Sequence, residues 1–249
     1  MTMAGTAMSR VDAAGQTRTS VVRLFQGPYV TRAGRRLEVP EGSKRLLVFV
    51  ALHRTRLERR YVAGTLWPDA DDARAAGNLR STLWRLRGAG IDVIAADKWS
   101  LALLDDVVVD TELANDWATR LINGTAGAGD LTIPPYWLDA LDLLPGWYDD
   151  WTYGERERLR QRTLHALEAL SRQLADAGRH AEAVDAAMAA VRAEPLRESA
   201  QRVLVEAHLA EGNLVEARRG YQAYRELLNR ELGVAPTFDV RTPVTTGVA

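Results

Sequence analysis

Residues 69–90, DADDARAAGNLRSTLWRLRGAG, are the stretch that decides the fold. Three aspartates open it, and carboxylates suit the positive end of a helix dipole. Gly88-Ala89-Gly90 closes it, so the pattern predicts a helix over Ala73–Arg87. On a wheel of 100° per residue the apolar side chains fall within about 60° of Leu79, which marks a buried face. These side chains are Ala75, Ala76, Leu79, Leu83 and Leu86.

The opposite face of the same helix carries side chains that suit the major groove of DNA. Arginine can donate two hydrogen bonds to guanine, asparagine can pair with adenine, and an aromatic ring can contact the methyl group of thymine. The candidates for base reading are Arg74, Asn78, Ser81, Trp84 and Arg85. A solvated surface is the alternative for the polar members. Trp84 has an alternative of its own, which is to pack beneath a neighbouring hairpin against Trp99.

The elements around this helix predict a winged helix-turn-helix over residues 21–105, preceded by a disordered stretch at 1–20. Short strands are expected at Val21–Phe25, Tyr29–Thr31 and Leu37–Val39. Two further helices are expected at Lys44–Arg54 and Arg59–Trp67. After the third helix, Ile91–Ile94 and Trp99–Leu104 are expected to form a hairpin, the wing, around a turn at Ala95-Ala96-Asp97.

Basic residues at two kinds of position are candidates for phosphate contact. Backbone N–H groups in the first turn of a helix favour an anion, and side chains flanking a reading face meet the DNA backbone. The wing offers a single basic residue near its turn, so minor-groove reading there is weakly supported. The candidates are Lys44, Arg45, Arg59, Arg60, Arg80, Arg87 and Lys98.

From Asp110 onward the pattern is helical. Helices are expected at Thr111–Ile122, Asp149–Ala177, Arg179–Ala193, Leu196–Glu211 and Asn213–Leu232. The break glycines Gly178 and Gly212 lie 34 residues apart, the period of tetratricopeptide repeats, and Ala183 matches Ala217 at the same offset. We therefore expect a tetratricopeptide-like domain over 106–237 and a tail at 238–249. The fold class is mainly α with a small β part.

The net charge of −1 conceals two halves of opposite sign. Residues 1–105 hold 17 basic and 10 acidic side chains, whereas the remainder holds 15 and 23. A basic half is a candidate for binding a polyanion. The chain has no cysteine, no apolar run near the ~20 residues that a membrane span needs, and no secretion-signal pattern, so the expected location is the cytoplasm.

The sequence does not indicate an enzyme. The four histidines, His53, His165, His180 and His208, lie on different expected helices without a metal-binding spacing. A glycine-rich phosphate loop is also missing from the sequence. We therefore expect no cofactor and no metal.

Taken together, these stretches resemble the Streptomyces antibiotic regulatory protein family. The resemblance covers roughly residues 21–237. In the N-terminal half it rests on VRLFQGP (22–28), KRLLV (44–48), LWP (66–68) and NLRSTLWRLR (78–87). In the C-terminal half it rests on VDT (109–111), LPGW (144–147), RERL (156–159), GRHAEA (178–183), EPLRE (194–198) and ELGVAP (231–236).

The resemblance implies an OmpR-type winged helix joined to a bacterial transcriptional activation domain, in the short two-domain form. It implies a regulator, usually an activator, that binds promoter repeats and engages RNA polymerase; we expect a homodimer on double-stranded DNA. Two other hypotheses stay open. One is a ligand-gated regulator with a pocket in the helical domain lined by Trp137, Trp147, Trp151 and Tyr153. The other is a protein-interaction adaptor that does not bind DNA.

Overall fold

The computed structural model describes residues 20–134 and 137–240, and the side chain of Trp137 lies outside that description. The chain divides into two compact units. The first, here the N-terminal unit, holds the residues up to Leu113 together with Asp142–Arg156. The second, the helical unit, holds Ala114–Leu141 and the residues from Glu157 onward. In the described residues no helix combines the length and the apolar character that crossing a bilayer requires.

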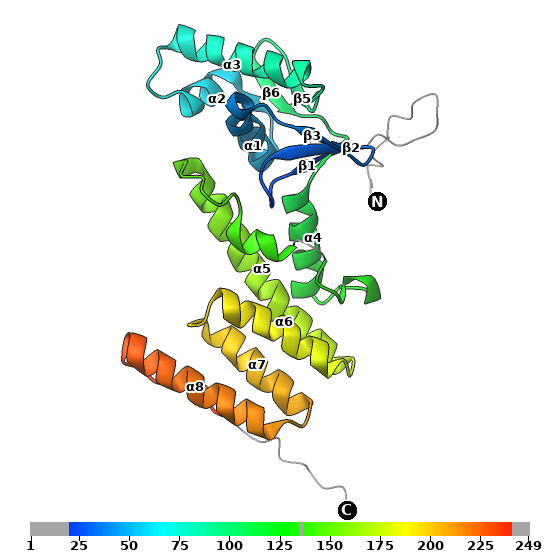
Figure 1. The fold of residues 1–249 in the computed structure, drawn as a ribbon, viewed down its shortest axis with the longest axis vertical. Coiled ribbons are helices and arrows are strands. Elements are labelled where there is room, and N and C mark those ends of the chain that lie inside the picture. The colour runs from blue at the N-terminus through cyan, green and yellow to red at the C-terminus, as the bar shows by residue number, and fades with distance from the viewer. Residues whose placement is uncertain (1–19, 135–136, 241–249) are drawn as a thin grey trace, which may run out of the picture. The chain divides into compact units, whose positions relative to one another are not determined.

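The N-terminal unit alternates short strands with three helices, as the winged-helix pattern predicts (Figure 1). Its strands are β1 (Ser20–Arg23), β2 (Tyr29–Arg32), β3 (Arg35–Glu38), β4 (Leu57–Glu58), β5 (Ile94–Ala96), β6 (Ser100–Leu103) and β7 (Val107–Val109). Its helices are α1 (Lys44–His53), α2 (Arg59–Leu66) and α3 (Asp72–Gly88), with a 3-10 turn at Glu41–Ser43.

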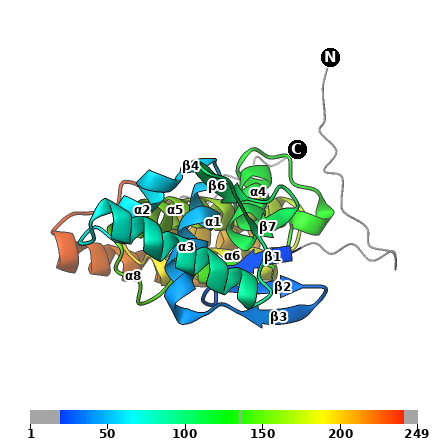
Figure 2. The same ribbon diagram turned by 90° about the horizontal axis from the view of Figure 1, so that it is seen from above.

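Four of the strands form a sheet in the order β3-β2-β1-β7. β1, β2 and β3 follow one another as an antiparallel meander, which Figure 2 shows from above. β7 lies parallel to β1, with Val22 opposite Val109. β7 was not predicted, because a run of three valines is too short to mark a strand until its partner is known.

The wing is a hairpin of β5 and β6, but its turn lies further along the chain than expected. Ile94 pairs with Leu103 and Ala96 with Leu101, so Ala95 and Ala96 belong to a strand and the turn is at Asp97–Trp99. The expected turn at residues 95–97 is therefore wrong. β4 adds a third strand to this sheet, and it was not predicted because it is two residues long.

The three helices enclose the core of the N-terminal unit. The six residues Leu46–Ala51 of α1 are all buried, as are Val62 and Leu66 of α2. On α3 the predicted apolar stripe is confirmed, since Leu79, Leu83 and Leu86 are buried. The stripe fixes the rotation of α3 and so determines which of its side chains face outward.

Residues 142–156, which include the start of α5 (Asp150–Asp176), belong to the N-terminal unit, although their sequence was assigned to the helical domain. The Trp151 ring meets the Phe49 ring edge-on at 5.0 Å between centroids, and the Trp147 ring lies 6.5 Å from that of Trp151. Arg156 donates to the carbonyl oxygens of Leu143 and Leu144, both at 2.8 Å, and so closes this segment into a compact turn. Aromatic contact and backbone capping together explain why residues 142–156 belong to this unit.

The helical unit is built from pairs of helices in the predicted repeat. Its helices are α4 (Asp110–Ile122), α5 (Asp150–Asp176), α6 (His180–Ala193), α7 (Glu198–Ala210) and α8 (Leu214–Leu232), with 3-10 turns at Ala128–Asp130 and Trp137–Asp142. α4 and α5 begin in the N-terminal unit and end in this one. Gly178 and Gly212 have φ angles of +73° and +82°, a conformation that favours glycine, and Ala183 and Ala217 are fully buried at equivalent places. α6, α7 and α8 stack side by side (Figure 1).

The residues after α8 fold back onto this unit. The Phe238 ring lies 5.4 Å from the ring of Tyr221 and 6.2 Å from that of Tyr224, with the Arg202 guanidinium 5.1 Å from its centroid. Phe238 was assigned to the tail at 238–249, and the structure gives it a packed position. At the other end Ser20 begins β1, and the expected disorder of 1–19 lies outside the described residues, as do residues 241–249.

Candidate nucleic-acid interface

The outward face of α3 is held in place from its first residue. The carboxylate of Asp71 accepts a hydrogen bond from the backbone N–H of Arg74 at 2.8 Å, which caps the helix as the aspartates predict. Of the proposed base-reading side chains, Arg74, Ser81, Trp84 and Arg85 are exposed and Asn78 is half-buried. All five therefore lie on the side of α3 that the core does not use.

Trp84 does not pack beneath the wing. Its side chain is 75 % exposed, so the alternative of a buried contact with Trp99 is wrong. The reason is geometric, because Trp84 lies one helical position from Leu83, whose side chain occupies the buried face. Its indole ring is therefore open to solvent on the outward face of α3.

The guanidinium of Arg85 lies over the 3-10 turn that precedes α1. Its Nη1 atom is 3.0 Å from the position that a Cβ atom on Gly42 would take. Glycine at position 42 thus leaves the space that this side chain fills. The tip of the Arg85 side chain, and not its base, thus lies beside this turn.

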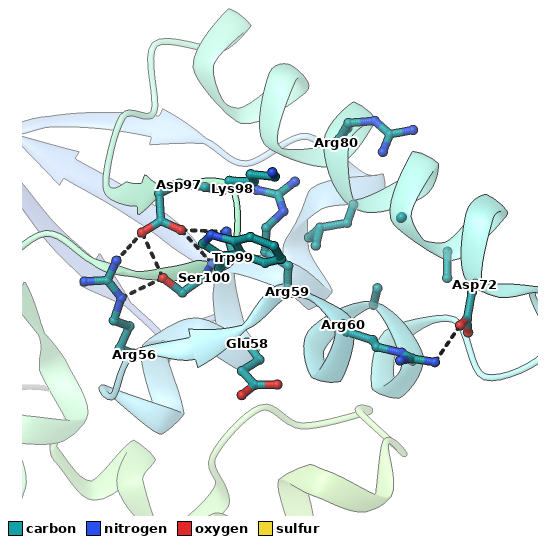
Figure 3. Close-up of a pocket in the computed structure, with 15 residues that line it drawn as sticks. Arg56, Glu58, Arg59, Arg60, Asp72, Arg80, Asp97, Lys98, Trp99 and Ser100 are labelled. Atoms are coloured by element: carbon teal, nitrogen blue, oxygen red, sulfur yellow. Dashed lines mark hydrogen bonds and ion pairs between the residues drawn. The ribbon is translucent and has the colours of Figure 1, made fainter.

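Beside α3 lies a groove of about 740 Å³ between α2, α3 and the wing turn (Figure 3). Its floor is apolar and comes from Ala63 of α2 together with Ala75, Ala76 and Leu79 of α3. Five cationic side chains and three carboxylates surround this floor. They are Arg56, Arg59, Arg60, Arg80 and Lys98, with Glu58, Asp72 and Asp97. A groove with an apolar floor and an excess of positive charge fits a phosphate strand.

The wing turn at one edge of this groove is organised by a single carboxylate (Figure 3). Asp97 accepts backbone hydrogen bonds from Trp99 at 2.7 Å and Ser100 at 2.8 Å, and it forms an ion pair with Arg56. These donors stabilise the ionised form, and the pKa of Asp97 falls to about 2, with the Ser100 N–H making the largest contribution.

Arg56 is a groove residue that the sequence analysis missed. Besides its ion pair with Asp97, its Nε atom donates to Ser100 Oγ at 2.6 Å. The residue lies just before β4, and the pairing of Leu57 with Leu101 carries it to the wing. Because β4 was not predicted, nothing in the sequence connected Arg56 with residues 97–100.

Four of the proposed phosphate contacts line or flank this groove. Arg59 donates to the Asp97 carbonyl at 3.3 Å, Arg60 pairs with Asp72 at 2.9 Å, and the Lys98 ammonium lies 4.7 Å from the centroid of the Trp99 ring. Arg80 is exposed and reaches over the groove from α3. The structure therefore brings Arg59, Arg60, Arg80 and Lys98 together.

Three other proposed phosphate contacts lie elsewhere. Lys44 pairs with Glu41 at 2.5 Å, and Arg87 lies 3.8 Å from Asp92 at the far end of α3. Arg45 donates to the Leu66 carbonyl at 2.9 Å and forms an ion pair with Asp149. A carboxylate from the segment 142–156 thus occupies the place where we expected a phosphate.

The aromatic residues proposed to line a ligand pocket in the helical domain do not gather there. Trp147, Trp151 and Tyr153 belong to the N-terminal unit, where the first two pack toward Phe49. The side chain of Trp137 lies outside the described residues. Within the described residues, no group of three or more histidine, cysteine, aspartate or glutamate side chains could hold a metal ion.

Comparison with known proteins assigns the chain to a family. Residues 139–243 match the bacterial transcriptional activator domain. Regulatory protein AfsR of Streptomyces griseus is 30 % identical over 187 residues, which are 68 % of this chain and 18 % of that protein. AfsR of Streptomyces coelicolor is 32 % identical over 180 residues, 69 % of this chain and 18 % of that protein. The chain belongs to the Streptomyces antibiotic regulatory protein family.

This family is one of regulatory proteins, and the present member spans about a fifth of the length of the AfsR relatives. A solved structure, Mycobacterium tuberculosis EmbR in complex with a low-affinity phosphopeptide, shares its fold with a TM-score of 0.61 at 19 % identity. The likeness covers 88 % of this chain and 62 % of EmbR. It confirms the expected fold class, mainly helical with a small β part at the N-terminus.

Proposed function

We propose that this family member activates transcription by binding double-stranded DNA through α3 and the adjoining groove. The observation that carries the proposal is the combination of an outward-facing polar stripe on α3 with a basic groove at its side. A helix that enters the major groove reads base edges, and the phosphate strand beside it needs a cationic seat. The residues that could read bases and those that could hold the phosphate strand all belong to the N-terminal unit.

The division of roles among these residues follows from where they lie. Arg74, Asn78, Ser81, Trp84 and Arg85 are proposed to contact bases, because they occupy the face opposite the core. Arg59, Arg60, Arg80 and Lys98 are proposed to contact the strand that passes between α3 and the wing. Lys44, Arg45 and Arg87 are proposed as secondary phosphate contacts, and Arg45 would first have to release Asp149.

The helical unit is proposed to engage RNA polymerase. Tetratricopeptide-like helices present extended surfaces to proteins, and the acidic balance of residues 106–249 makes a second DNA-binding surface there unfavourable. We further propose that two copies bind repeated promoter sites as a homodimer. In this scheme the N-terminal unit selects the DNA site and the helical unit contacts RNA polymerase.

The proposal is tested by a salt titration of DNA binding with the full chain. The probe is the promoter fragment upstream of the chain's own gene, together with a duplex of scrambled sequence. If the basic groove contacts phosphates, log K falls linearly with log salt, with a slope near −0.9 for each phosphate neutralised. Arg80→Ala should flatten this slope by about 0.9. Arg219→Ala is the matched control, since its side chain is exposed on α8, and it should leave the slope unchanged.

Absence of binding to every promoter fragment at about 50 mM salt would overturn the DNA-binding proposal and favour the adaptor hypothesis. Equal affinity for the promoter and the scrambled duplex would retain phosphate binding and refute base reading. The role of the helical unit is tested separately, by reconstituted transcription from the bound promoter with RNA polymerase. Binding without any change in transcript yield would remove activation from the proposal.

A further inference from the structure

An exposed tryptophan stands in the groove, next to the turn of the wing. The Trp99 side chain is 74 % exposed, and its indole ring lines the groove together with Arg59 and Lys98 (Figure 3). We propose that Trp99 is a stacking contact for the DNA strand in this groove and that Asp97 is the positioning residue that holds it there. The inference rests on the proposed function and adds to it an apolar contact that neither composition nor charge assigned.

The backbone of Trp99 is fixed on both sides. Its N–H group donates to the Asp97 carboxylate at 2.7 Å, and its carbonyl oxygen accepts a hydrogen bond from the backbone N–H of Arg59 at 2.9 Å. The next residue, Ser100, donates to Asp97 through both its N–H and its hydroxyl. The main chain that carries this ring is therefore ordered before any partner arrives, which lowers the entropic cost of the contact.

The sign of the charge on Asp97 supports a positioning role. A carboxylate on a surface that meets phosphates repels them, so its presence in the groove calls for another explanation. Asp97 is opposed by Arg56, whose guanidinium pairs with the carboxylate and also donates to Ser100 Oγ. The repulsion is thus offset locally, while the hydrogen bonds keep the turn in shape.

The indole itself suits a nucleic-acid strand. In duplex DNA the faces of the bases are covered by their neighbours, so the indole would stack on the deoxyribose rings of the strand, which are the same at every sequence. Lys98 holds its ammonium group near the same ring, so the turn presents an apolar plane and a cation side by side. A phosphate with its attached sugar offers the complementary pair, an anion beside an apolar ring.

The first experiment compares two equally exposed tryptophans. Trp99→Ala should weaken binding of the promoter duplex by about 5- to 10-fold, the order expected for one lost apolar contact. Because no charge is removed, the salt slope should stay at the wild-type value. Trp99→Phe should restore most of the affinity. The loss should be nearly equal for every single-base variant of the site, whereas Trp84→Ala should change the preference at particular bases.

The second experiment uses the sign of the effect at position 97. If charge alone mattered, Asp97→Ala would tighten DNA binding by removing a repulsion and freeing Arg56. We expect it to weaken binding instead. Asp97→Asn should be intermediate, because an amide oxygen in place of Oδ1 still accepts both backbone hydrogen bonds, whereas the ion pair with Arg56 and the hydrogen bond from the Ser100 hydroxyl at Oδ2 are lost. In a Trp99→Ala background, Asp97→Ala should cost little more, since the residue it positions is gone.

The outcomes separate the inference from the proposed function. If the wild-type chain binds and Arg80→Ala weakens it while Trp99→Ala binds normally, the stacking contact is refuted and DNA binding stands. If Asp97→Ala binds more tightly, the positioning role is refuted. If the wild-type chain itself fails to bind, the proposed function falls first. Thermal unfolding of each variant shows whether a loss of affinity reflects a loss of fold.

Discussion

Arg45 at the start of α1 forms an ion pair with Asp149, just before α5. The Arg45 guanidinium also donates to the carbonyl of Leu66 at 2.9 Å, so one side chain ties α1 to the end of α2 and to residues 142–156. The pair is partly exposed to solvent, which limits its contribution to stability. Within the N-terminal unit it joins residues 142–156 to α1 and α2.

The first prediction is that Arg45→Ala affects stability more than it affects DNA contact. We expect the free energy of unfolding to fall by about 1 kcal/mol, from lost hydrogen bonds and a weakened ion pair. The salt slope of DNA binding should flatten less than in Arg80→Ala, because a secondary phosphate contact by Arg45 first has to break its ion pair with Asp149. A slope that flattens as much for Arg45→Ala as for Arg80→Ala would show that the ion pair opens on DNA.

The second prediction concerns base preference. Arg74 and Arg85 lie 11 residues apart on the outward face of α3, which separates their starting points by about 16 Å along the helix. Each should therefore affect a different base pair. Arg85→Ala should cost about 1–3 kcal/mol at one position of the site and little elsewhere, as measured over single-base operator variants. Uniform weakening across all variants would remove Arg85 from base reading.

The third prediction uses the contact between Gly42 and Arg85. Gly42→Ala places a methyl group 3.0 Å from Arg85 Nη1, so the flexible guanidinium must shift. We expect thermal stability close to that of the wild type, and a base preference changed at the same position as in Arg85→Ala. Gly88→Ala is the matched control, since a Cβ atom at position 88 meets nothing within 4 Å. An unchanged preference in Gly42→Ala would mean that the Arg85 side chain is free of the turn.

The fourth prediction is a pH dependence that originates at Asp110. Burial raises the pKa of this carboxyl to about 6, although the backbone N–H groups of Leu24 and Phe25 donate to it. In the unfolded chain the pKa is about 3.9, so between these values the folded protein holds a proton that the unfolded chain has released. The contribution of Asp110 to stability is therefore full below about pH 4 and declines as the pH rises through about 6, by about 3 kcal/mol in total.

Urea unfolding of wild type and Asp110→Asn at about pH 5 and about pH 7.5 measures this effect. The asparagine variant does not titrate, so the difference in unfolding free energy between the two proteins should change between the two pH values, with the wild type losing stability as the pH rises. A difference that stays constant would show that Asp110 ionises at its ordinary pKa in the folded protein.

The fifth prediction concerns the return of the chain after α8. Phe238→Ala removes a ring that packs on Tyr221 and Tyr224, and we expect the helical unit to lose about 1–2 kcal/mol of stability. Val234→Ala, at a half-exposed position nearby, should be neutral. Calorimetry resolves the two variants. Equal melting temperatures for both would mean that residues 237–240 do not stabilise the unit.

Regular features of this protein could be predicted from sequence because local pattern determines them. The stripe of leucines in α3 required a helix with one buried face, and the aspartates before it specified where the helix begins. The repeat of 34 residues between Gly178 and Gly212 placed the breaks between α5 and α6 and between α7 and α8. In each case the information lay in the spacing of residues along the chain.

The groove could not be predicted because distant residues form it. Arg56 reaches Ser100 through a two-residue strand, and Asp97, whose carboxylate organises the wing turn, was assigned to the end of an expected turn rather than to its start. Arg45 was expected to contact a phosphate, but it pairs with the carboxylate of Asp149, which lies 104 residues later in the chain. Pairings of this kind depend on tertiary structure, which propensity and periodicity do not contain.

The parallel pairing of β1 with β7 also has a consequence in time. The backbone N–H of Leu24 finds its carboxylate partner at Asp110, 86 residues later in the chain. At a synthesis rate of about 5–20 residues per second, the first strand waits roughly 4–17 s on the ribosome before the residues that complete its sheet have been made. Closing so long a loop is slow compared with forming a helix. The nascent chain therefore has β1, β2, β3 and the helices α1, α2 and α3 available before β7 is made, and this sheet is completed only when translation has passed into α4.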